Sequence, residues 1–264
     1  MNYSMNDIIK GMTEVARLCG KTILEAKEEH VKATNKSGIR DLVTAYDVRV
    51  QKQAIKELGA RFQNAVFFCE EGDDKGSLSA EMTFVIDPID GTANFANNMN
   101  ISCISIACFL DGVPSAGVVY DPYTDELFSA AKGTGSYLNS RKIRVTEENL
   151  EGSLVLFGTS PYNIELLDRT MDKLKYIFPK CLDVRRCGSA ALDICGVAAG
   201  KAGLFFEEIL ALWDYAAALV ILNEAGGVAV NMKGEPLPLD GSRTNIIAGP
   251  ARNIEQSGLL KDFD

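Results

Sequence analysis

Two spacings of apolar residues alternate along the chain, and each is typical of a different element. Near the N-terminus apolar residues recur every three or four positions, which predicts an amphipathic helix with its apolar face formed by Ile8, Met12, Val15, Cys19, Ile23 and Ala26. A polar segment, 35–43, then predicts a loop or hairpin. Thr44 and Asp47 fit a capping box for a second helix that ends at Gly59. Its expected apolar positions include Val48, Ala54, Ile55 and Leu58.

Short continuous apolar runs predict buried strands in the next part of the chain. One run, 65–69, ends at Glu70. The run that begins at Met82 is expected to end at Asp87, because Pro88 disfavours helix at the preceding residue and has no N–H to donate. A short helix is expected to start within 93–100. Runs separated by Asp-Gly, Asp-Pro and Gly-Thr-Gly turns then predict an antiparallel meander with strands at 102–110, 113–120, 126–131 and 136–138.

The rest of the chain alternates predicted strands and helices, which indicates an α/β fold class. Strands are expected at 154–157, 182–185, 203–206, 228–230 and 246–248, and helices at 164–178, 190–199 and 213–225. The last helix is apolar on nearly every face, which predicts that it is buried. We expect one domain over 1–264 with halves at about 1–148 and 149–264.

Composition narrows the class of protein. Of 264 residues 47% are hydrophobic and 24% charged, which is typical of a soluble globular chain. The net charge of −9 argues against a nucleic-acid partner. No apolar run is long enough to cross a bilayer and the N-terminus lacks a signal-peptide layout, so we expect a cytoplasmic protein without membrane contact. Seven cysteines without a Cys-x-x-Cys pair indicate a reducing compartment and core packing.

The chemistry indicated by the sequence depends on carboxylates, because His30 is the only histidine. Asp87 and Asp90 follow a predicted buried strand and precede Gly91 and Thr92, whose backbone N–H groups can face an anion. Two crowded carboxylates repel one another unless they are protonated or bridged by a cation. This predicts a metal-assisted phosphate site, with an Asx-type turn as the alternative.

Three further acids have both a structural and a chemical interpretation. Asp214 begins the buried helix, where a capping role suits the helix dipole, yet its carboxylate points toward the interior. Capping is also the structural role for Asp47. Glu70 and Glu71 follow a strand; Glu71 is expected to be solvated, and Glu70 is the one we assign to the site.

These motifs resemble those of the inositol monophosphatase family. The similar segments are Lys36 to Asp47, Glu70-Glu71, Asp87-Pro88-Ile89-Asp90-Gly91-Thr92, Gly188-Ser189-Ala190-Ala191, Trp213-Asp214 and Glu224-Ala225-Gly226-Gly227. They run in order over most of the chain. Each motif alone is weakly specific, and the ordered set is highly specific.

The resemblance implies a layered αβαβα sandwich, as in inositol monophosphatase and fructose-1,6-bisphosphatase, a homodimer, and a Mg²⁺-dependent, lithium-sensitive phosphatase with two or three ions. It implies that the metal ligands are Glu70, Asp87, the carbonyl of Ile89, Asp90 and Asp214. It also implies that Asp47 and Thr92 orient the attacking water beside Glu70. The substrate contacts that it implies are Asp90, Gly91, Thr92, Ala190 and Glu207.

The substrate expected from these residues is a small polyol phosphate, with inositol monophosphate first. Glu207 is suited to accept hydrogen bonds from hydroxyl groups. Arg185 and Arg186 are candidates to hold a second phosphate, or are solvated charges, so fructose 1,6-bisphosphate stays a candidate. The resemblance also admits 3′-phosphoadenosine 5′-phosphate, histidinol phosphate and NADP as substrates. The family commonly has a histidine and a proline where this chain has Asn97-Asn98-Met99-Asn100, and this difference bears on the substrate.

Two different classes of function compete with this hypothesis. A haloacid-dehalogenase-type phosphatase uses Asp-x-Asp, whereas Asp87 and Asp90 are separated by two residues. A non-catalytic phosphate-binding protein of this fold would be expected to have lost at least one metal-binding residue. In this sequence every expected metal-binding position carries a residue that can bind a metal. Ser160 and Tyr162 follow a predicted strand near the substrate side and receive no role.

Overall fold

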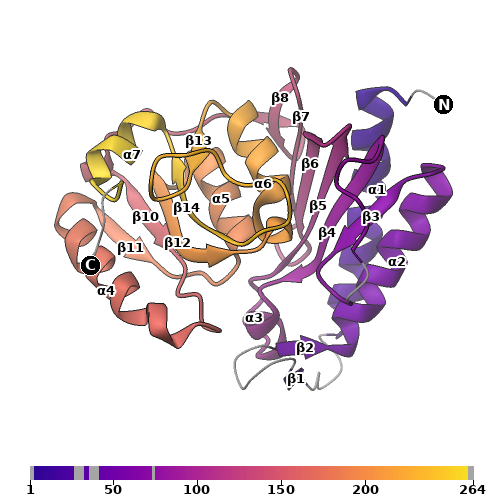
Figure 1. Cartoon of the computed structure of the whole chain (residues 1–264), viewed down its shortest axis with the longest axis horizontal. Coiled ribbons are helices and arrows are strands. Elements are labelled where there is room, and N and C mark those ends of the chain that lie inside the picture. The colour runs from indigo at the N-terminus through magenta and orange to yellow at the C-terminus, as the bar shows by residue number, and fades with distance from the viewer. Residues whose placement is uncertain (1–2, 27–32, 36–41, 73–74, 261–264) are drawn as a thin grey trace.

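The computed structural model describes residues 3–26, 33–35, 42–72 and 75–260, and all statements of structure refer to these. Two sheets are stacked with helices outside each sheet and between them, which gives the layer order α/β/α/β/α (Figure 1). The predicted layered sandwich is therefore confirmed. The predicted division into two halves stays a prediction, although the seven-stranded sheet comes from residues 66–143 and the five-stranded sheet from residues 154–249.

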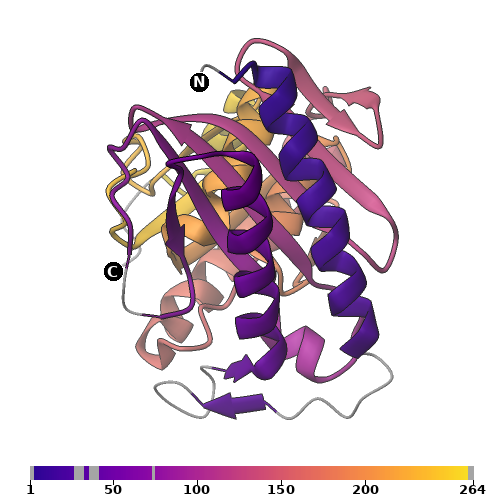
Figure 2. The same ribbon diagram turned by 90° about the vertical axis from the view of Figure 1, so that its right-hand side faces the viewer.

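Helices α1 (Met5–Glu25) and α2 (Ala45–Arg61) cover the outer face of the seven-stranded sheet (Figure 2). The predicted apolar face of α1 is buried, with each of its six side chains at most 1% exposed. Thr44 and Asp47 form the predicted capping box of α2. The helix continues two residues beyond Gly59, and Val48 is exposed where Val50 is buried, because the sheet and α1 select the 46–50–54–58 face. Those two predictions were wrong.

The seven-stranded sheet confirms the antiparallel meander. Its strands are β3 (Val66–Cys69), β4 (Met82–Asp90), β5 (Cys103–Leu110), β6 (Val113–Asp121), β7 (Glu126–Ala131), β8 (Gly135–Leu138) and β9 (Arg141–Ile143), in that spatial order. Only β3 and β4 run parallel. β4 does not end at Asp87 as predicted, because a register shift between Asp87 and Asp90 lets the strand pass Pro88. The expected short helix follows as α3 (Thr92–Ala96).

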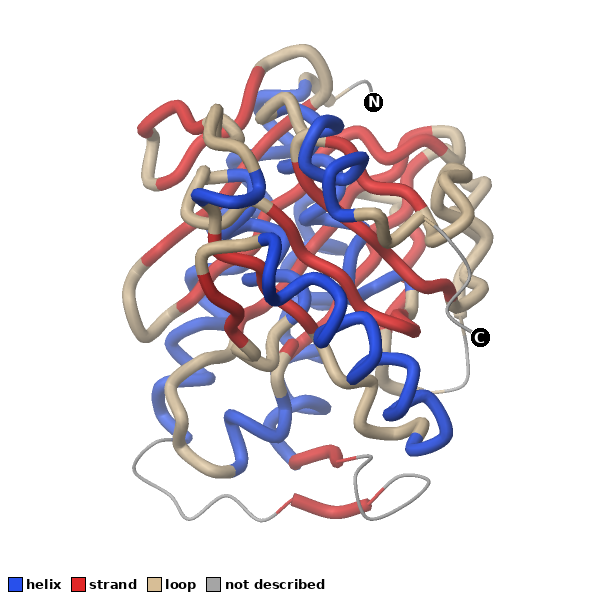
Figure 3. Tube along the Cα trace, turned by 90° about the vertical axis from the view of Figure 1, so that its left-hand side faces the viewer, coloured by secondary structure: helices blue, strands red, loops and turns tan. Residues whose placement is uncertain are grey.

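The five-stranded sheet has the order β11-β10-β12-β14-β13 and mixes parallel with antiparallel pairs. Its strands are β10 (Leu154–Phe157), β11 (Asp183–Arg185), β12 (Leu204–Leu210), β13 (Val228–Val230) and β14 (Thr244–Gly249). Helices α4 (Leu167–Ile177) and α7 (Ala251–Ser257) lie on its outer side (Figure 3). The predicted helix 164–178 is therefore shorter, since 3₁₀ turns flank α4.

Helices α5 (Ala190–Ala198) and α6 (Leu212–Glu224) fill the space between the sheets (Figure 1). Their small side chains allow close approach to the strands, and a Cβ atom on Gly117 of β6 would overlap the main-chain oxygen of Ala217. As predicted, α6 is buried on nearly all sides. It contacts β4, β5, β6, β7 and β8 of one sheet and β13 of the other.

A short hairpin lies apart from these layers. β1 (Ala33–Asn35) pairs antiparallel with β2 (Leu42–Thr44), as expected for the hairpin, which was one of the two predicted alternatives. Residues 36–41 and His30 lie outside the described residues. All seven cysteines are free and five are buried, in line with the predicted core role. In the described ranges no helix is both long and apolar enough to cross a bilayer.

Candidate active site

A cavity of about 90 Å³ lies where the ends of β4, β10 and β12 meet the starts of α3, α5 and α6. Six of the residues predicted for the site line it: Asp90, Gly91, Thr92, Ala190, Glu207 and Asp214. The other lining residues are Ala93, Gly158, Pro161, Tyr162, Arg186, Gly188, Ser189, Asp193 and Leu210. Residues from both sheets and from three helices thus contribute to one cavity.

The turn after β4 is fixed by its glycine. Gly91 has a φ of +92°, a left-handed conformation that favours glycine. A Cβ atom there would lie 2.9 Å from the Ile101 oxygen and 3.1 Å from the Gly188 oxygen, so the turn also needs a residue without a side chain. Asn94 ties the turn to the second half of the chain, because its Nδ2 donates to the Cys187 oxygen at 2.8 Å. This arrangement brings Gly91 and Thr92 to the cavity wall.

Asp47 and Thr92 lie together although 45 residues separate them. Thr92 Oγ1 is 3.4 Å from Asp47 Oδ1 and 3.2 Å from the Ile89 oxygen. The other oxygen of Asp47 accepts the Thr44 N–H at 2.8 Å, which is the capping role. Burial, followed by the nearby charges of Glu70 and Glu71, raises the pKa of Asp47 to about 6 despite those hydrogen bonds. The capping carboxylate therefore also faces the Thr92 hydroxyl.

Four predicted acids affect one another electrostatically. Burial raises the pKa of Asp87 well above its ordinary value, and the charges of Glu70, Asp90 and Asp214 raise it further. Burial, then Asp90 and Glu70, also raises the pKa of Asp214 strongly. The pKa of Asp90 rises to about 6 because of burial, although Ser189 Oγ and the Ala191 N–H donate to its Oδ2 at 2.6 and 2.7 Å. The four carboxyl groups are therefore neighbours.

The chemical nature of these acids suits the binding of a divalent cation. Mg²⁺ prefers hard carboxylate and carbonyl oxygens, and a cation close to these acids would offset both the burial and the mutual repulsion that raise their pKa values. Within the described ranges, no lysine or arginine forms an ion pair with Asp87, Asp90 or Asp214. In the same ranges, no three histidine, cysteine, aspartate or glutamate side chains are close enough together to hold a metal as they stand.

Local hydrogen bonds account for part of that spacing. Asp87 Oδ1 accepts the Ile89 N–H at 3.0 Å, and Asp214 Oδ2 accepts the Ala211 N–H at 2.7 Å, the predicted helix cap. Asp87 also shares a side-chain hydrogen bond with Glu70, which links these two acids directly. Lys75 is close to the group, since its Nζ donates to the main-chain oxygen of Glu70 at 2.8 Å and lies 4.6 Å from the Trp213 ring centroid.

The opposite wall of the cavity is built around Glu207 on β12. Its Oε1 accepts the Ser160 N–H at 2.9 Å and lies 3.3 Å from Ser160 Oγ. A Cβ atom on Gly158 would overlap its carboxylate, so glycine is required there. Burial raises the pKa of Glu207 to about 7. Ser160, to which the sequence assigned no role, holds this acid although its own φ is +42°, which is costly for a non-glycine residue.

Asp193 belongs to no motif of the sequence and was not predicted for the site. It is 4% exposed, and it lines the cavity between Ala190 and Glu207. The sequence feature that could have pointed to Asp193 is its charge, because it is the only charged residue in a helix of small and apolar residues. Of the two candidate phosphate-binding arginines, Arg186 lines the cavity, whereas Arg185 pairs with Asp183 at the surface.

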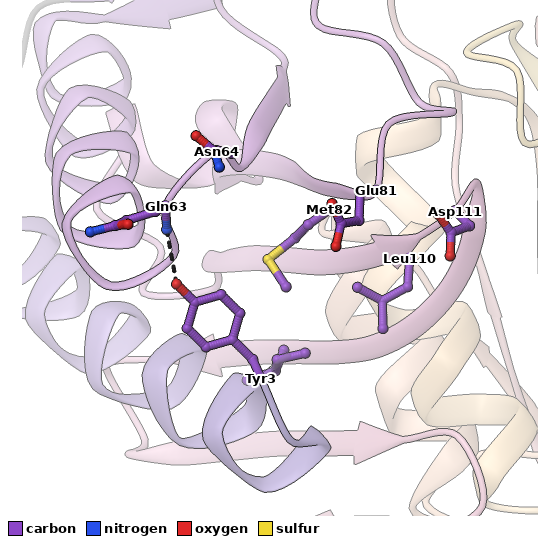
Figure 4. Close-up of a pocket in the computed structure, with 8 residues that line it drawn as sticks. Tyr3, Gln63, Asn64, Glu81, Met82, Leu110 and Asp111 are labelled. Carbon is purple, nitrogen blue, oxygen red and sulfur yellow. Dashed lines mark hydrogen bonds between the residues drawn. The ribbon is translucent and has the colours of Figure 1, made fainter. Parts of the chain in front are cut away.

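A larger cavity, of about 220 Å³, lies at the other end of β4 and β5 (Figure 4). Its apolar floor includes Met82 and Leu110, and Tyr3 Oη accepts the Gln63 N–H at 3.1 Å. Glu81 and Asp111 lie on its rim. None of the predicted site residues is among the residues that line it. The smaller cavity is therefore the candidate active site.

The layered fold and the buried acids beside the Gly91–Thr92 turn are the arrangement expected of the phosphatase family that the motifs resemble. A sequence profile of the inositol monophosphatase family matches residues 4–264. The chain therefore belongs to the inositol monophosphatase family.

Individual relatives include proteins named inositol monophosphatase and proteins named Nus factor SuhB. The chain is 34% identical over 234 residues to an inositol-1-monophosphatase of Synechocystis, covering 88% of this chain and 81% of the relative. It is 35% identical over 230 residues to the Nus factor SuhB of Xylella fastidiosa, covering 86% of this chain and 82% of the relative. The crystal structure of extragenic suppressor protein SuhB from Bartonella henselae matches with a TM-score of 0.90 at 30% identity, covering 97% and 99% of the two chains.

Proposed function

We propose that this protein is a Mg²⁺-dependent phosphomonoesterase that hydrolyses a small polyol phosphate, with inositol monophosphate as the first candidate. The observation that carries the proposal is the cavity itself, where the Gly91–Thr92 turn and Asp90 lie on one side and Glu207 on the other. A phosphate and a hydroxyl-rich alcohol therefore have separate walls to contact. The relative named inositol-1-monophosphatase supports the same substrate class.

In this proposal two or three Mg²⁺ ions are held by Glu70, Asp87, the Ile89 carbonyl, Asp90 and Asp214. When bound, such ions neutralise charge on the phosphoryl group and lower the pKa of a bound water. Since no three of the described side chains are close enough together to hold a metal as they stand, binding would require these carboxylates to move. Ionised carboxylates are required for that ligation, which makes metal affinity depend on pH.

The Asp47–Thr92 pair is proposed to orient the attacking water. Thr92 Oγ1 lies 3.4 Å from Asp47 Oδ1, so the hydroxyl can donate to the carboxylate and accept a hydrogen bond from water. Asp47 is 0% exposed, and its position is fixed by the Thr44 cap. Glu70 is the third group assigned to this step. Positioning and charge neutralisation supply most of the catalysis in phosphoryl transfer, so no histidine is needed.

The backbone N–H groups of Gly91 and Thr92 are proposed to bind phosphate oxygens, and Ala190 and Glu207 to contact the alcohol. Oε2 of Glu207 has no partner among the described residues, so it is available to a substrate hydroxyl. Arg186 at the cavity rim supports fructose 1,6-bisphosphate or another doubly charged ester as the second candidate. Arg185 supports it less, because Asp183 already neutralises it.

A panel of phosphate esters, assayed with Mg²⁺ and with EDTA, tests the function. We expect Mg²⁺-dependent release of phosphate from a polyol monophosphate and inhibition by lithium. Asp87→Asn should lower turnover by at least about 10³-fold while the melting temperature stays within a few degrees of wild type. Release of no phosphate from any ester would refute the proposal and favour a binding protein. Trapping of an aspartyl-phosphate analogue by beryllofluoride would favour the haloacid-dehalogenase mechanism.

The remaining assignments belong to the same proposal. We propose a homodimer and a cytoplasmic location, as expected for a protein of this family. The net charge of −9 supports the absence of a nucleic-acid partner. Size-exclusion chromatography with light scattering tests the dimer, and a single-chain mass would refute it.

A further inference from the structure

Asp193 lies on the face of α5 that forms the cavity wall. It follows Ala190 by three residues, and side chains three apart share one face of a helix. Both residues line the cavity. Asp193 does not cap the helix, because Ser189 is the N-cap and its Oγ accepts the Leu192 N–H at 3.4 Å. A capping role therefore does not explain a buried acid here.

The carboxyl group of Asp193 has few hydrogen-bond partners for its burial. Among the described residues its partner is the thiol of Cys187, a weak donor. Two neighbouring acids in the cavity are better satisfied: Asp90 accepts from both Ser189 Oγ and the Ala191 N–H, and Glu207 accepts from Ser160. Buried polar groups normally have partners, so unused acceptor capacity that faces a cavity indicates a ligand.

The groups around Asp193 are complementary to hydroxyls. The free Oε2 of Glu207 is a second acceptor in the same cavity. Arg186 supplies donors at the rim, where its guanidinium lies against Gly188 and its Nη2 is 3.3 Å from Thr159 Oγ1. Hydroxyls both donate and accept, so neighbouring hydroxyls on a ring can satisfy two carboxyl groups and a guanidinium together.

We propose that Asp193 is a specificity-determining residue that accepts hydrogen bonds from the hydroxyls of the substrate alcohol, beside Glu207. The inference rests on the proposed phosphomonoesterase function and sharpens its substrate class. The alcohol is then one with adjacent hydroxyls, such as a cyclitol, rather than an alcohol with a single oxygen. An ester whose ring lacks these hydroxyls leaves Asp193 and Glu207 without ligands.

The test compares two esters that share a ring and a scissile bond, myo-inositol 1-phosphate and cyclohexyl phosphate. The measured quantity is the ratio of their kcat/KM values for each enzyme. Because both values come from one preparation, the ratio does not depend on how much of a variant is folded. Burial raises the pKa of Asp193 to about 8, so near neutral pH we expect Asp193→Ala to lower the ratio by about 2- to 10-fold, as for loss of a hydrogen bond between uncharged groups. Asp193→Asn, which keeps one acceptor oxygen, should have an intermediate ratio.

Matched variants separate the outcomes. Glu207→Gln should lower the ratio in the same direction, and Asp168→Asn, at an exposed position of α4, should leave it unchanged. If Asp193→Ala reduces both kcat/KM values equally, the residue has a structural role and the inference is wrong. Wild-type enzyme that hydrolyses neither ester nor any other would instead refute the proposed function.

Discussion

The buried ion pair between α4 and β12 offers the sharpest test of how this fold is held together. Lys173 and Glu208 are each about 1% exposed at the side chain, and Nζ lies 2.8 Å from Oε1. The contact is an ion pair without hydrogen-bond geometry at that oxygen. Arg169 approaches the other oxygen only to 3.8 Å and is half exposed. Glu208 therefore depends mainly on Lys173 for its neutralisation.

Lys173→Met would keep the bulk of the side chain and remove its charge. Breaking one side of a buried ion pair costs about 3–5 kcal/mol, because the partner stays buried with its charge. For a chain of this size each kcal/mol lowers the melting temperature by about 2–4 °C, so we expect a fall of about 6–20 °C. The assay is thermal unfolding followed by circular dichroism.

Two comparisons test the reasoning behind that number. Lys175→Met on the same helix removes a pair whose members are 77% and 57% exposed, and it should change stability by less than about 1 kcal/mol. Lys173→Met combined with Glu208→Leu should regain most of the lost stability, since no buried charge is left. A Lys173→Met protein that melts within about 2 °C of wild type would show that Glu208 is not held as described.

Three further predictions concern the site. Asp214→Asn should abolish Mg²⁺-dependent turnover with little change in melting temperature; near-wild-type turnover would contradict its role. Gly158→Ala places a methyl group where the Glu207 carboxylate lies, and should lower kcat/KM for a polyol phosphate at least about 10-fold; an unchanged value would mean that Glu207 is not used. Burial raises the pKa of Asp47 and of Asp90 to about 6, so between about pH 4 and 6 the folded metal-free protein holds protons that the unfolded chain has lost. Its stability should therefore fall as pH rises through that range, and Mg²⁺ should raise the melting temperature more at about pH 7.5 than at about pH 5; melts in EDTA and in Mg²⁺ at both pH values measure this, and equal Mg²⁺ shifts would refute it.

Helices and strands with a regular spacing or a continuous run of apolar residues were predictable from the sequence. The ranges of β7, β10 and β13 agree with their predicted runs, and the apolar face of α1 agrees at every position. The three-residue β9 and the seven-residue α7 were missed because they are short and mostly polar. The continuation of β4 past Pro88 depends on its pairing with β5, which no local pattern shows.

The candidate site was predictable to the extent that its residues occur in motifs. Seven residues of the quoted motifs line one cavity, although they come from segments far apart in the chain: Asp90, Gly91, Thr92, Gly188, Ser189, Ala190 and Asp214. Asp193 and Ser160 could not be placed in this way, since their contribution depends on how α5 and the loop after β10 pack against β12. Val48 shows the same limit in the fold, because two valines in one helix fit different faces and only the sheet selects between them.

The position of α6 bears on whether either half of this protein exists alone. The helix belongs to the second half, yet most of its strand neighbours are in the first. A fragment that ended near residue 148 would leave Val85, Phe109 and Phe128 uncovered on the inner side of its sheet. Such a fragment is expected to aggregate until the missing piece is supplied in trans. Two fragments of this chain, divided near residue 148, are therefore expected to fold only when both are present.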